Sequence, residues 1–122
     1  MALPRLLNLS EAFTRVEGHW RPHLAGELNG QQVKLARIQG EFDWHSHAGE
    51  DELFLVVRGS MRLEFRDGVQ EMGEGDMCIV PRGVEHRPVA EHECHILLFE
   101  PAETVNTGDV VSDRTVSVLP RV

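Results

Sequence analysis

The stretch that decides the fold is GEFDWHSHAGEDELFLVVRG, residues 40–59. It places His45 and His47 two residues apart in an expected strand over residues 41–47, and Glu52 at the head of an apolar run over residues 53–57. Side chains two residues apart in a strand project from the same face, so both imidazoles can reach one metal ion. Burying a carboxylate is costly unless a cation or hydrogen bonds compensate its charge. The stretch therefore predicts a metal site that uses these three side chains.

A second stretch, GDMCIVPRGVEH at residues 75–86, provides a fourth candidate ligand. His86 follows a turn at residues 81–83, and this rigid turn can bring the chain back across the predicted metal site. Three neutral imidazoles and one carboxylate suit a borderline divalent ion, which leaves Fe, Mn, Ni, Co, Cu and Zn open. We therefore predict one divalent transition metal per chain, held by His45, His47, Glu52 and His86.

The spacing of both stretches resembles that of the cupin superfamily. The residues that match its first motif are Gly40, His45, His47, Glu52 and Gly59. The residues that match its second motif are Gly75, Pro81, Gly83 and His86. Two positions depart from the family pattern: Gly40 lies one residue closer to His45 than usual, and residue 90 is Ala where the family has Asn. Neither departure removes a ligand of the family's metal.

This resemblance implies an all-β fold, the double-stranded β-helix or cupin jelly-roll barrel (RmlC-like), with one metal in its interior. The residues around the motifs, including 99–101, are also similar to short bacterial single-domain cupins that are labelled sugar-isomerase-like. Such barrels are usually dimeric, so the resemblance implies a homodimer. We expect a single domain over residues 1–122, with the barrel core at about residues 33–101.

The remaining pattern is that of an all-β chain, with short apolar runs between turn-forming residues. Asn29-Gly30 and Asp67-Gly68 are the strongest hairpin signals. Near the N-terminus, Ser10 is expected to cap a short helix over residues 10–13. About nine or ten strands are expected. They lie at residues 23–28, 31–38, 41–47, 53–57, 61–65, 69–72, 77–80, 87–90 and 94–99, with short edge strands at 110–111 and 115–119.

The formal net charge is −8, from 20 acidic against 12 basic residues. An acidic surface repels phosphate backbones, and the scattered bases form no cluster that would hold a membrane surface. The first nine residues contain no long apolar stretch of the kind found in a signal peptide or membrane span. Cys78 and Cys94 lie in apolar runs and are interpreted as reduced thiols, with a disulfide between them left open. We therefore expect a cytoplasmic protein that binds neither nucleic acid nor membrane.

Several other polar residues compete for roles at the site. Glu50 and Asp51 are alternatives to Glu52, but Glu52 has the right distance to the next glycine and begins the strand. Asp43 shares a face with the two histidines and is a candidate acceptor for an imidazole N–H, although a position at the rim is favoured. His95 is expected to have a structural role, and it could assist catalysis only if it faces the cavity.

A metal that keeps open positions in a barrel interior can polarise a bound substrate, water or dioxygen. The first hypothesis is therefore a metal-dependent enzyme for a small organic molecule, of the dioxygenase or oxidase type or of the sugar-isomerase type. The chain has no tyrosine, which excludes mechanisms that need a tyrosine base. A phosphosugar isomerase would need cationic groups at the cavity. The candidates are Arg37, Arg58, Arg62, Arg82 and Arg87. The alternative is a non-catalytic barrel in which the metal anchors a small ligand for binding or sensing.

Overall fold

The computed structural model describes residues 3–122. Within them, the strands are β1 (His23–Leu28), β2 (Gln31–Glu41), β3 (Glu52–Arg58), β4 (Met61–Phe65), β5 (Gly68–Met72), β6 (Met77–Val80) and β7 (His86–Pro101). One short helix, α1 (Leu9–Phe13), precedes them. No helix in this part of the chain is long and apolar enough to cross a membrane. The fold is therefore all-β apart from one short helix, as the sequence predicts.

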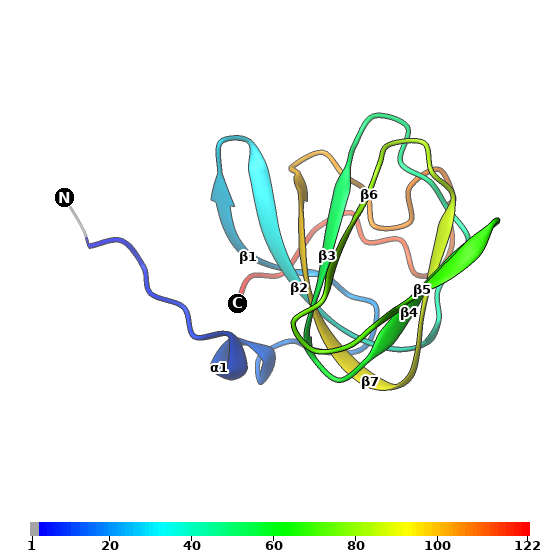
Figure 1. The fold of residues 1–122 in the computed structure, drawn as a ribbon. Coiled ribbons are helices and arrows are strands. Elements are labelled where there is room, and N and C mark those ends of the chain that lie inside the picture. Colours follow the sequence, from blue (N-terminus) through cyan, green and yellow to red (C-terminus); the bar gives the residue numbers. More distant parts are fainter. Residues whose placement is uncertain (1–2) are drawn as a thin grey trace.

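The strands form a jelly-roll barrel around β7, which pairs with β2, β3 and β4 (Figure 1). The main antiparallel sheet has the order β1-β2-β7-β3-β6. The start of β7, from His86 to Val89, pairs with β4, and its later part, from Cys94 onward, pairs with both β2 and β3. One long strand thus pairs with three others in a single seven-stranded sheet that encloses the interior. This is the barrel that the two motifs imply.

The expected strand over residues 41–47 does not form. The strand β2 continues to Glu41, and His45 then makes only an isolated antiparallel bridge with His86. The chain opposite this segment contains Pro88, which has no N–H to donate, so a regular ladder cannot continue there. Instead the N–H of Phe42 donates to the carbonyl oxygen of Pro88 at 3.0 Å. The segment is therefore a loop, although His45 and His47 are still buried in the interior.

The count of nine or ten strands is also wrong, because the described residues contain seven. Residues 87–90 and 94–99 belong to one continuous strand, β7, since residues 91–93 remain extended. The edge strands expected at 110–111 and 115–119 are absent from the described chain. Side chains hold that segment instead: the hydroxyls of Thr107 and Thr115 lie 2.7 Å apart, and the N–H of Val116 donates to the Asn106 side chain at 2.9 Å. Such local bonds compete with a backbone ladder.

The turn predictions are confirmed at the first hairpin and shifted at the second. Asn29 and Gly30 have φ of 52° and 78°, as a type I′ turn requires. Phe65 pairs directly with Gly68, so the second turn lies one residue earlier than predicted. The helix α1 forms, but its cap is Asn8, whose side chain accepts from the N–H of Glu11 at 3.0 Å.

Two apolar clusters stabilise the fold. The larger one fills the barrel, because alternate residues of each strand face inward; on β3 these are Glu52, Phe54 and Val56. The smaller one lies between α1 and the outer face of β2 and includes Phe13, Leu35 and Val122. Each large apolar side chain buried in this way contributes about 1.5–3 kcal/mol. The inward phase of β3 is what brings the Glu52 carboxylate into the interior.

Candidate metal centre

The four predicted ligands come together inside the barrel. His45 and His47 lie in the loop after β2, Glu52 begins β3, and His86 begins β7. One ligand atom from each residue lies within 4.8 Å of the others, and all four side chains are buried. Donors bound to one ion at about 2.0–2.2 Å lie at separations of this order. The group could therefore hold a metal ion.

Backbone carbonyls fix the orientation of two of the rings. His45 Nδ1 lies 2.8 Å from the carbonyl oxygen of Asp43, and His86 Nδ1 lies 2.9 Å from that of Val84. A carbonyl oxygen only accepts hydrogen bonds, so Nδ1 carries the proton in both rings and Nε2 keeps its lone pair. His86 Nε2 points at Glu52, with Oε1 3.2 Å away. This arrangement is typical of metal-binding histidines.

His47 provides the most direct sign that the residues fit a metal. Its Nε2 lies 3.3 Å from Glu52 Oε1, yet neither ring nitrogen has a hydrogen-bond partner within the described residues. Leaving a buried polar group unpaired costs about 1–3 kcal/mol. A divalent ion between the four side chains would take up the free lone pair of this ring.

The electrostatics favour the protonation states that bind a cation. Burial, and then the neighbouring His86, lowers the pKa of His45 to about 4, so this ring is neutral at neutral pH. Burial acts to raise the pKa of Glu52. The neighbouring side chains of Glu100, His47 and His86 outweigh burial and hold that pKa well below its ordinary value. The site thus combines imidazole lone pairs with a carboxylate anion.

A buried ion pair lies behind Glu52, and the sequence analysis missed it. Lys34 Nζ donates to Glu100 Oε1 at 2.8 Å, and the two side chains are only 2% and 1% exposed. Burial, and then the charge of Glu52, raises the pKa of Glu100 well above its ordinary value, while Lys34 opposes the shift. The available signal was the period of two: Lys34 has the same parity as the inward-facing Ala36 and Ile38 of this strand.

The segment after β7 packs directly on the backbone between the two loop histidines. The N–H of Asp109 donates to the carbonyl oxygen of Ser46 at 3.0 Å, and the N–H of Ser46 donates to Asp109 Oδ1 at 2.9 Å. Gly108 has φ of +58°, and a Cβ there would overlap the Ser46 carbonyl and come within 3.0 Å of His45 Cδ2. Glycine is therefore needed at this position. In the sequence, Gly108-Asp109 reads as an ordinary turn and gives no sign of this contact.

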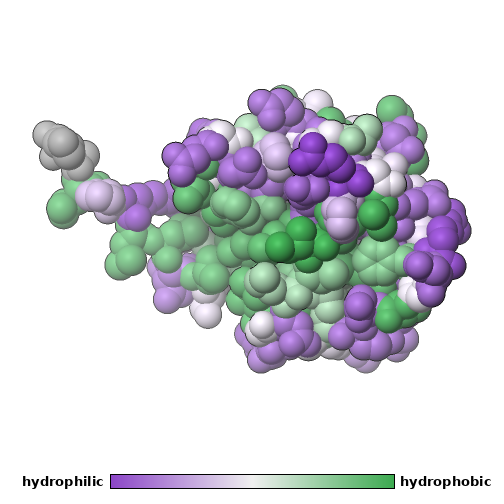
Figure 2. Space-filling model, turned by 45° about the horizontal axis from the view of Figure 1, so that its top comes forward, coloured by the Kyte–Doolittle hydropathy of each residue, from purple (hydrophilic) through white to green (hydrophobic). Residues whose placement is uncertain are grey.

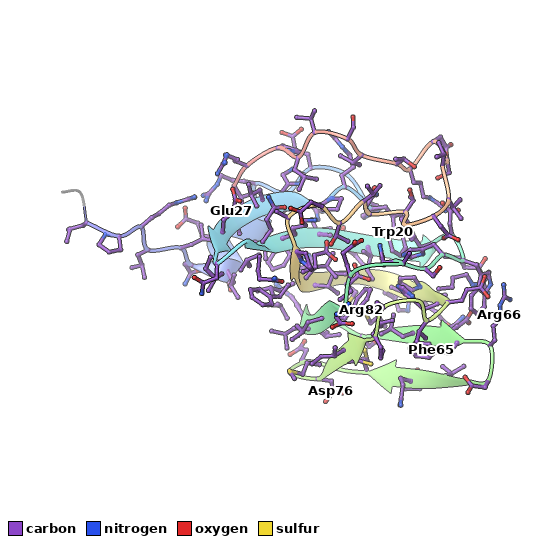
Figure 3. The ribbon with its side chains drawn as sticks, turned by 90° about the horizontal axis from the view of Figure 1, so that it is seen from above. Trp20, Glu27, Phe65, Arg66, Asp76 and Arg82 are labelled. Carbon is purple, nitrogen blue, oxygen red and sulfur yellow. The ribbon has the colours of Figure 1, made fainter. Side chains whose placement is uncertain are left out.

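A small cavity of about 40 Å³ adjoins two of the four residues, His45 and Glu52. His45 and Glu52 form one side, and most of the remaining wall is apolar. Trp20 and Phe42 are stacked in this wall, with ring centroids 4.7 Å apart. Figure 3 shows Trp20 beside the C-terminal segment, at the same end of the barrel as the loops that carry the histidines. The group thus has a small, largely apolar space on one side.

His95 does not reach the cavity, and the Asp43 carboxylate does not accept from an imidazole. His95 lies on the outer face of the barrel, where it stacks on Phe13 at 4.6 Å and bonds to Glu93 at 3.1 Å. It therefore cannot assist chemistry in the cavity. The Asp43 side chain accepts from the Ser112 hydroxyl at 2.8 Å, so the acceptor for an imidazole is the backbone of Asp43 and not its carboxylate.

The remaining acids, arginines and thiols lie away from the four ligands. Asp51 is exposed and accepts from the backbone N–H of Arg82. Within the described chain, no arginine lines the cavity. Arg37 bonds to Glu93, Arg62 and Arg87 bond to Glu64, Arg82 pairs with Asp51, and Arg58 is exposed. Cys78 and Cys94 are free thiols, and burial raises the pKa of both.

Comparison with known proteins identifies related chains. Residues 32–100 match the family described as Cupin domain. A cupin-2 domain containing protein from Shewanella frigidimarina NCIMB 400 is 41% identical with a TM-score of 0.77, and the match covers 79% of this chain and 94% of that protein. Protein NMB1881 from Neisseria meningitidis is 31% identical with a TM-score of 0.74, covering 80% and 100%.

A curated relative is the uncharacterized protein YdbB from Bacillus subtilis (strain 168). It is 39% identical over 62 residues, which are 50% of this chain and 55% of YdbB. The chain therefore spans about half the length of this relative. The two motifs, the jelly-roll barrel and the match over residues 32–100 all agree, and the chain accordingly belongs to the cupin superfamily.

Proposed function

We propose that this cupin is a metal-dependent enzyme that acts on a small organic molecule, as an oxidoreductase of the dioxygenase or oxidase type or as an isomerase. The observation that carries this proposal is that the buried ligand group adjoins an apolar cavity. Structural metal sites are usually closed by four protein ligands with no adjoining space, whereas catalytic sites keep a position free for water or substrate.

In this proposal the Nε2 atoms of His45, His47 and His86 and the carboxylate of Glu52 hold one divalent transition ion. When bound, the ion supplies a Lewis acid for an oxygen of the substrate, and redox chemistry if it is Fe, Mn or Cu. The carbonyls of Asp43 and Val84 keep two of the rings in the binding orientation. The apolar wall keeps bulk water away and so strengthens electrostatic interactions at the site.

The test is elemental analysis of protein prepared without a metal-affinity tag, followed by turnover assays on the apo and reloaded forms. We expect about one equivalent of metal per chain, with oxygen-dependent or isomerising turnover that is lost on chelation and regained on reloading. Failure to bind metal after reloading would overturn the proposal. Stoichiometric metal and saturable ligand binding without turnover would instead establish the non-catalytic binding barrel.

We also propose that the chain forms a homodimer through the outer face of β3, β6 and β7. Apolar side chains adjoin one another across these strands in the ladder register. They are Leu53, Leu55, Met77, Ile79, Leu97 and Phe99. Met77 and Ile79 are 60% and 54% exposed. Figure 2 shows apolar side chains gathered in a band across the middle of the molecule.

A second copy of this chain suits that face better than another partner. An apolar face is complementary to itself, which is what a two-fold interface requires. The N-terminal segment also extends away from the barrel (Figure 1), and its Leu3 and Leu6 side chains are almost fully exposed. An extended apolar segment of this kind can pack on a neighbouring copy.

A further inference from the structure

We infer that residues 102–119, the segment that follows β7, form a lid that opens to admit the substrate to the metal centre. The inference rests on the proposed function and identifies the route by which a substrate reaches that site. In Figure 1 the lid belongs to the orange-to-red chain that runs from the end of β7 back to β1. The size of the cavity, the residues that separate it from larger spaces, and the contacts of the segment all support this role.

The cavity beside the ligand group is too small for an organic substrate. Its volume of about 40 Å³ has room for no more than about three water molecules, whereas sites for small molecules measure about 300–1,000 Å³. All four ligand residues are buried, and two of them, His45 and Glu52, line the cavity. This is therefore the closed form of the site, and a substrate reaches the metal only after part of the wall moves.

The part of the wall that can move lies outside the strands. Two larger spaces of about 610 Å³ and 460 Å³ lie next to it, and residues 115–118 of the lid line both. Asn106 and Pro22 line the small cavity and also the 610 Å³ space. Trp20, which lies beside the lid in Figure 3, lines the small cavity and the 460 Å³ space. Because the lid carries Asn106, its displacement joins the cavity to a space large enough for a small molecule.

The lid has fixed ends and no backbone ladder in its middle. At one end the N–H of Ala102 donates to the Gly30 carbonyl at 3.0 Å, and at the other the N–H of Leu24 donates to the Pro120 carbonyl at 2.8 Å. Both ends are thus held on the hairpin of β1 and β2, and residues 102–119 contain no strand. Loops longer than about 12–15 residues without secondary structure are uncommon in compact domains, and active-site lids are among them. Such a segment can move about its two ends.

The lid is held shut by contacts with the loop that carries His45. The Ser112 hydroxyl donates to Asp43 Oδ2 at 2.8 Å, and the N–H of Asp109 donates to the Ser46 carbonyl at 3.0 Å. Water replaces these partners when the lid opens, so each hydrogen bond favours the closed form by a factor of only about five. Opening is therefore a local event that needs far less free energy than unfolding of the barrel.

Two reactions on the metal-free protein measure the opening of the lid. Trypsin cleaves after Arg114 only when the chain around this lid residue leaves the barrel. Diethyl pyrocarbonate acylates imidazoles and is too large for a cavity of 40 Å³, so it reaches the buried His47 only when the lid is open. The exposed His92 reports the activity of the reagent in the same sample. Peptide mass spectrometry follows both reactions, and each rate is divided by that of the same sequence in a short synthetic peptide.

Cleavage after Arg114 and acylation of His47 should both be slowed at least about tenfold less than cleavage after Arg62 in β4, which requires the barrel to unfold. Ser112→Ala removes the hydrogen bond to Asp43 and should raise the rates at Arg114 and His47 about fivefold. Ser117→Ala makes the same change at an exposed residue of the lid outside these hydrogen bonds, and it should change neither rate.

The outcomes separate the lid from the function beneath it. His47 slowed as strongly as Arg62 means that the site opens only when the barrel unfolds, which overturns the inference. Faster cleavage after Arg114 in Ser112→Ala without faster acylation of His47 means that the segment does not cover the site. That result, or no change in either rate, also overturns the inference, and in each case the metal function stands. A reloaded protein without metal means that the metal function fails, whereas the rates in the apo-protein still decide whether the lid opens.

Discussion

His47 differs from the other two histidines of the site because the protein holds neither of its ring nitrogens. His45 and His86 are each fixed by a backbone carbonyl, so their orientation does not depend on a metal. For His47, coordination would be the main interaction of the ring. The orientation of the His47 ring should therefore depend more on bound metal than that of His45 or His86.

His47→Ala is expected to lose most of the bound metal while the barrel remains folded. The imidazole removed is already unpaired, so no hydrogen bond within the described structure is lost with it. Elemental analysis together with thermal melts in the presence and absence of added metal provides the measurement, because a ligand that binds only the folded state raises Tm. A full equivalent of metal in this variant would contradict the ligand assignment.

Glu52 and the nearby Glu50 allow a matched test of the role of negative charge in metal binding. Glu52→Gln keeps the shape of the side chain and removes the anion, and it should weaken metal binding roughly tenfold or more. Glu50→Gln lies two residues earlier, outside the ligand group, and should leave the affinity unchanged. Competition with a metal-binding dye measures both. A larger effect at Glu50 would mean that the predicted carboxylate is the wrong one.

At the scale of elements, the segment after β7 supports the site through the Ser46–Asp109 bonds. Gly108→Ala introduces a Cβ that overlaps the Ser46 carbonyl at a φ of +58°. We expect a loss of about 1–3 kcal/mol in the free energy of unfolding, together with weaker metal binding because Ser46 lies between two ligands. Gly49→Ala is the control in the loop that carries Ser46, since a Cβ there meets nothing within 4 Å. Urea titrations of the apo and holo proteins compare the two variants.

A second element-scale contact ties the N-terminal segment and β2 to β7. Glu93 accepts from Arg37 at 2.9 Å, His19 at 2.8 Å and His95 at 3.1 Å. The Arg37 hydrogen bond, followed by those of His19 and His95, lowers the pKa of Glu93 from 4.5 to about 2. A depressed carboxyl pKa stabilises the fold above pH 4.5, and this stabilisation is lost as the pH falls through about 2.

Glu93→Gln should therefore lower the free energy of unfolding by about 1 kcal/mol at pH 6, after allowance for its partial exposure to solvent. The difference between wild type and variant should shrink as the pH falls towards 2. Urea midpoints across this range provide the measurement. Glu91→Gln, at a carboxylate that is 78% exposed, should change little; an equal effect at both positions would contradict the role of the cluster.

The elements that the sequence predicted well are those with a local signal. Alternation and turn residues located β1, β3, β4 and β6, and Asn29-Gly30 has the backbone that its residue types favour. The motif spacing predicted that His45, His47, Glu52 and His86 lie together, and the structure places them within reach of one another. Residues 41–47 were predicted as a strand because their side chains alternate. That alternation does not reveal that Pro88, in the facing strand β7, has no N–H with which to complete the ladder. Gly108 and Glu100 were missed for the same reason: their importance depends on contacts with residues far away in the sequence.

At the scale of the whole molecule, the proposed homodimer makes a distinct prediction. Ile79→Glu places a charge in the apolar face and should convert the dimer to a monomer, because an unpaired charge in an interface is costly. Val69→Glu introduces the same charge at another exposed strand position, on β5, and should leave the dimer intact. Sedimentation or light scattering measures the molecular mass of the wild type and of both variants in solution. A monomeric wild type would show that the face is not an interface between copies.

Lys34 is the one lysine of the chain, and its amine lies in the interior against Glu100. A reagent that acylates lysine side chains therefore reaches its target only when this side of the barrel opens. The rate of acylation at Lys34, followed by peptide mass spectrometry, measures how often the wall behind Glu52 opens under native conditions. If the carboxylate on the other side of that wall holds a cation, loading the protein should slow the labelling in proportion to the stability that the cation adds.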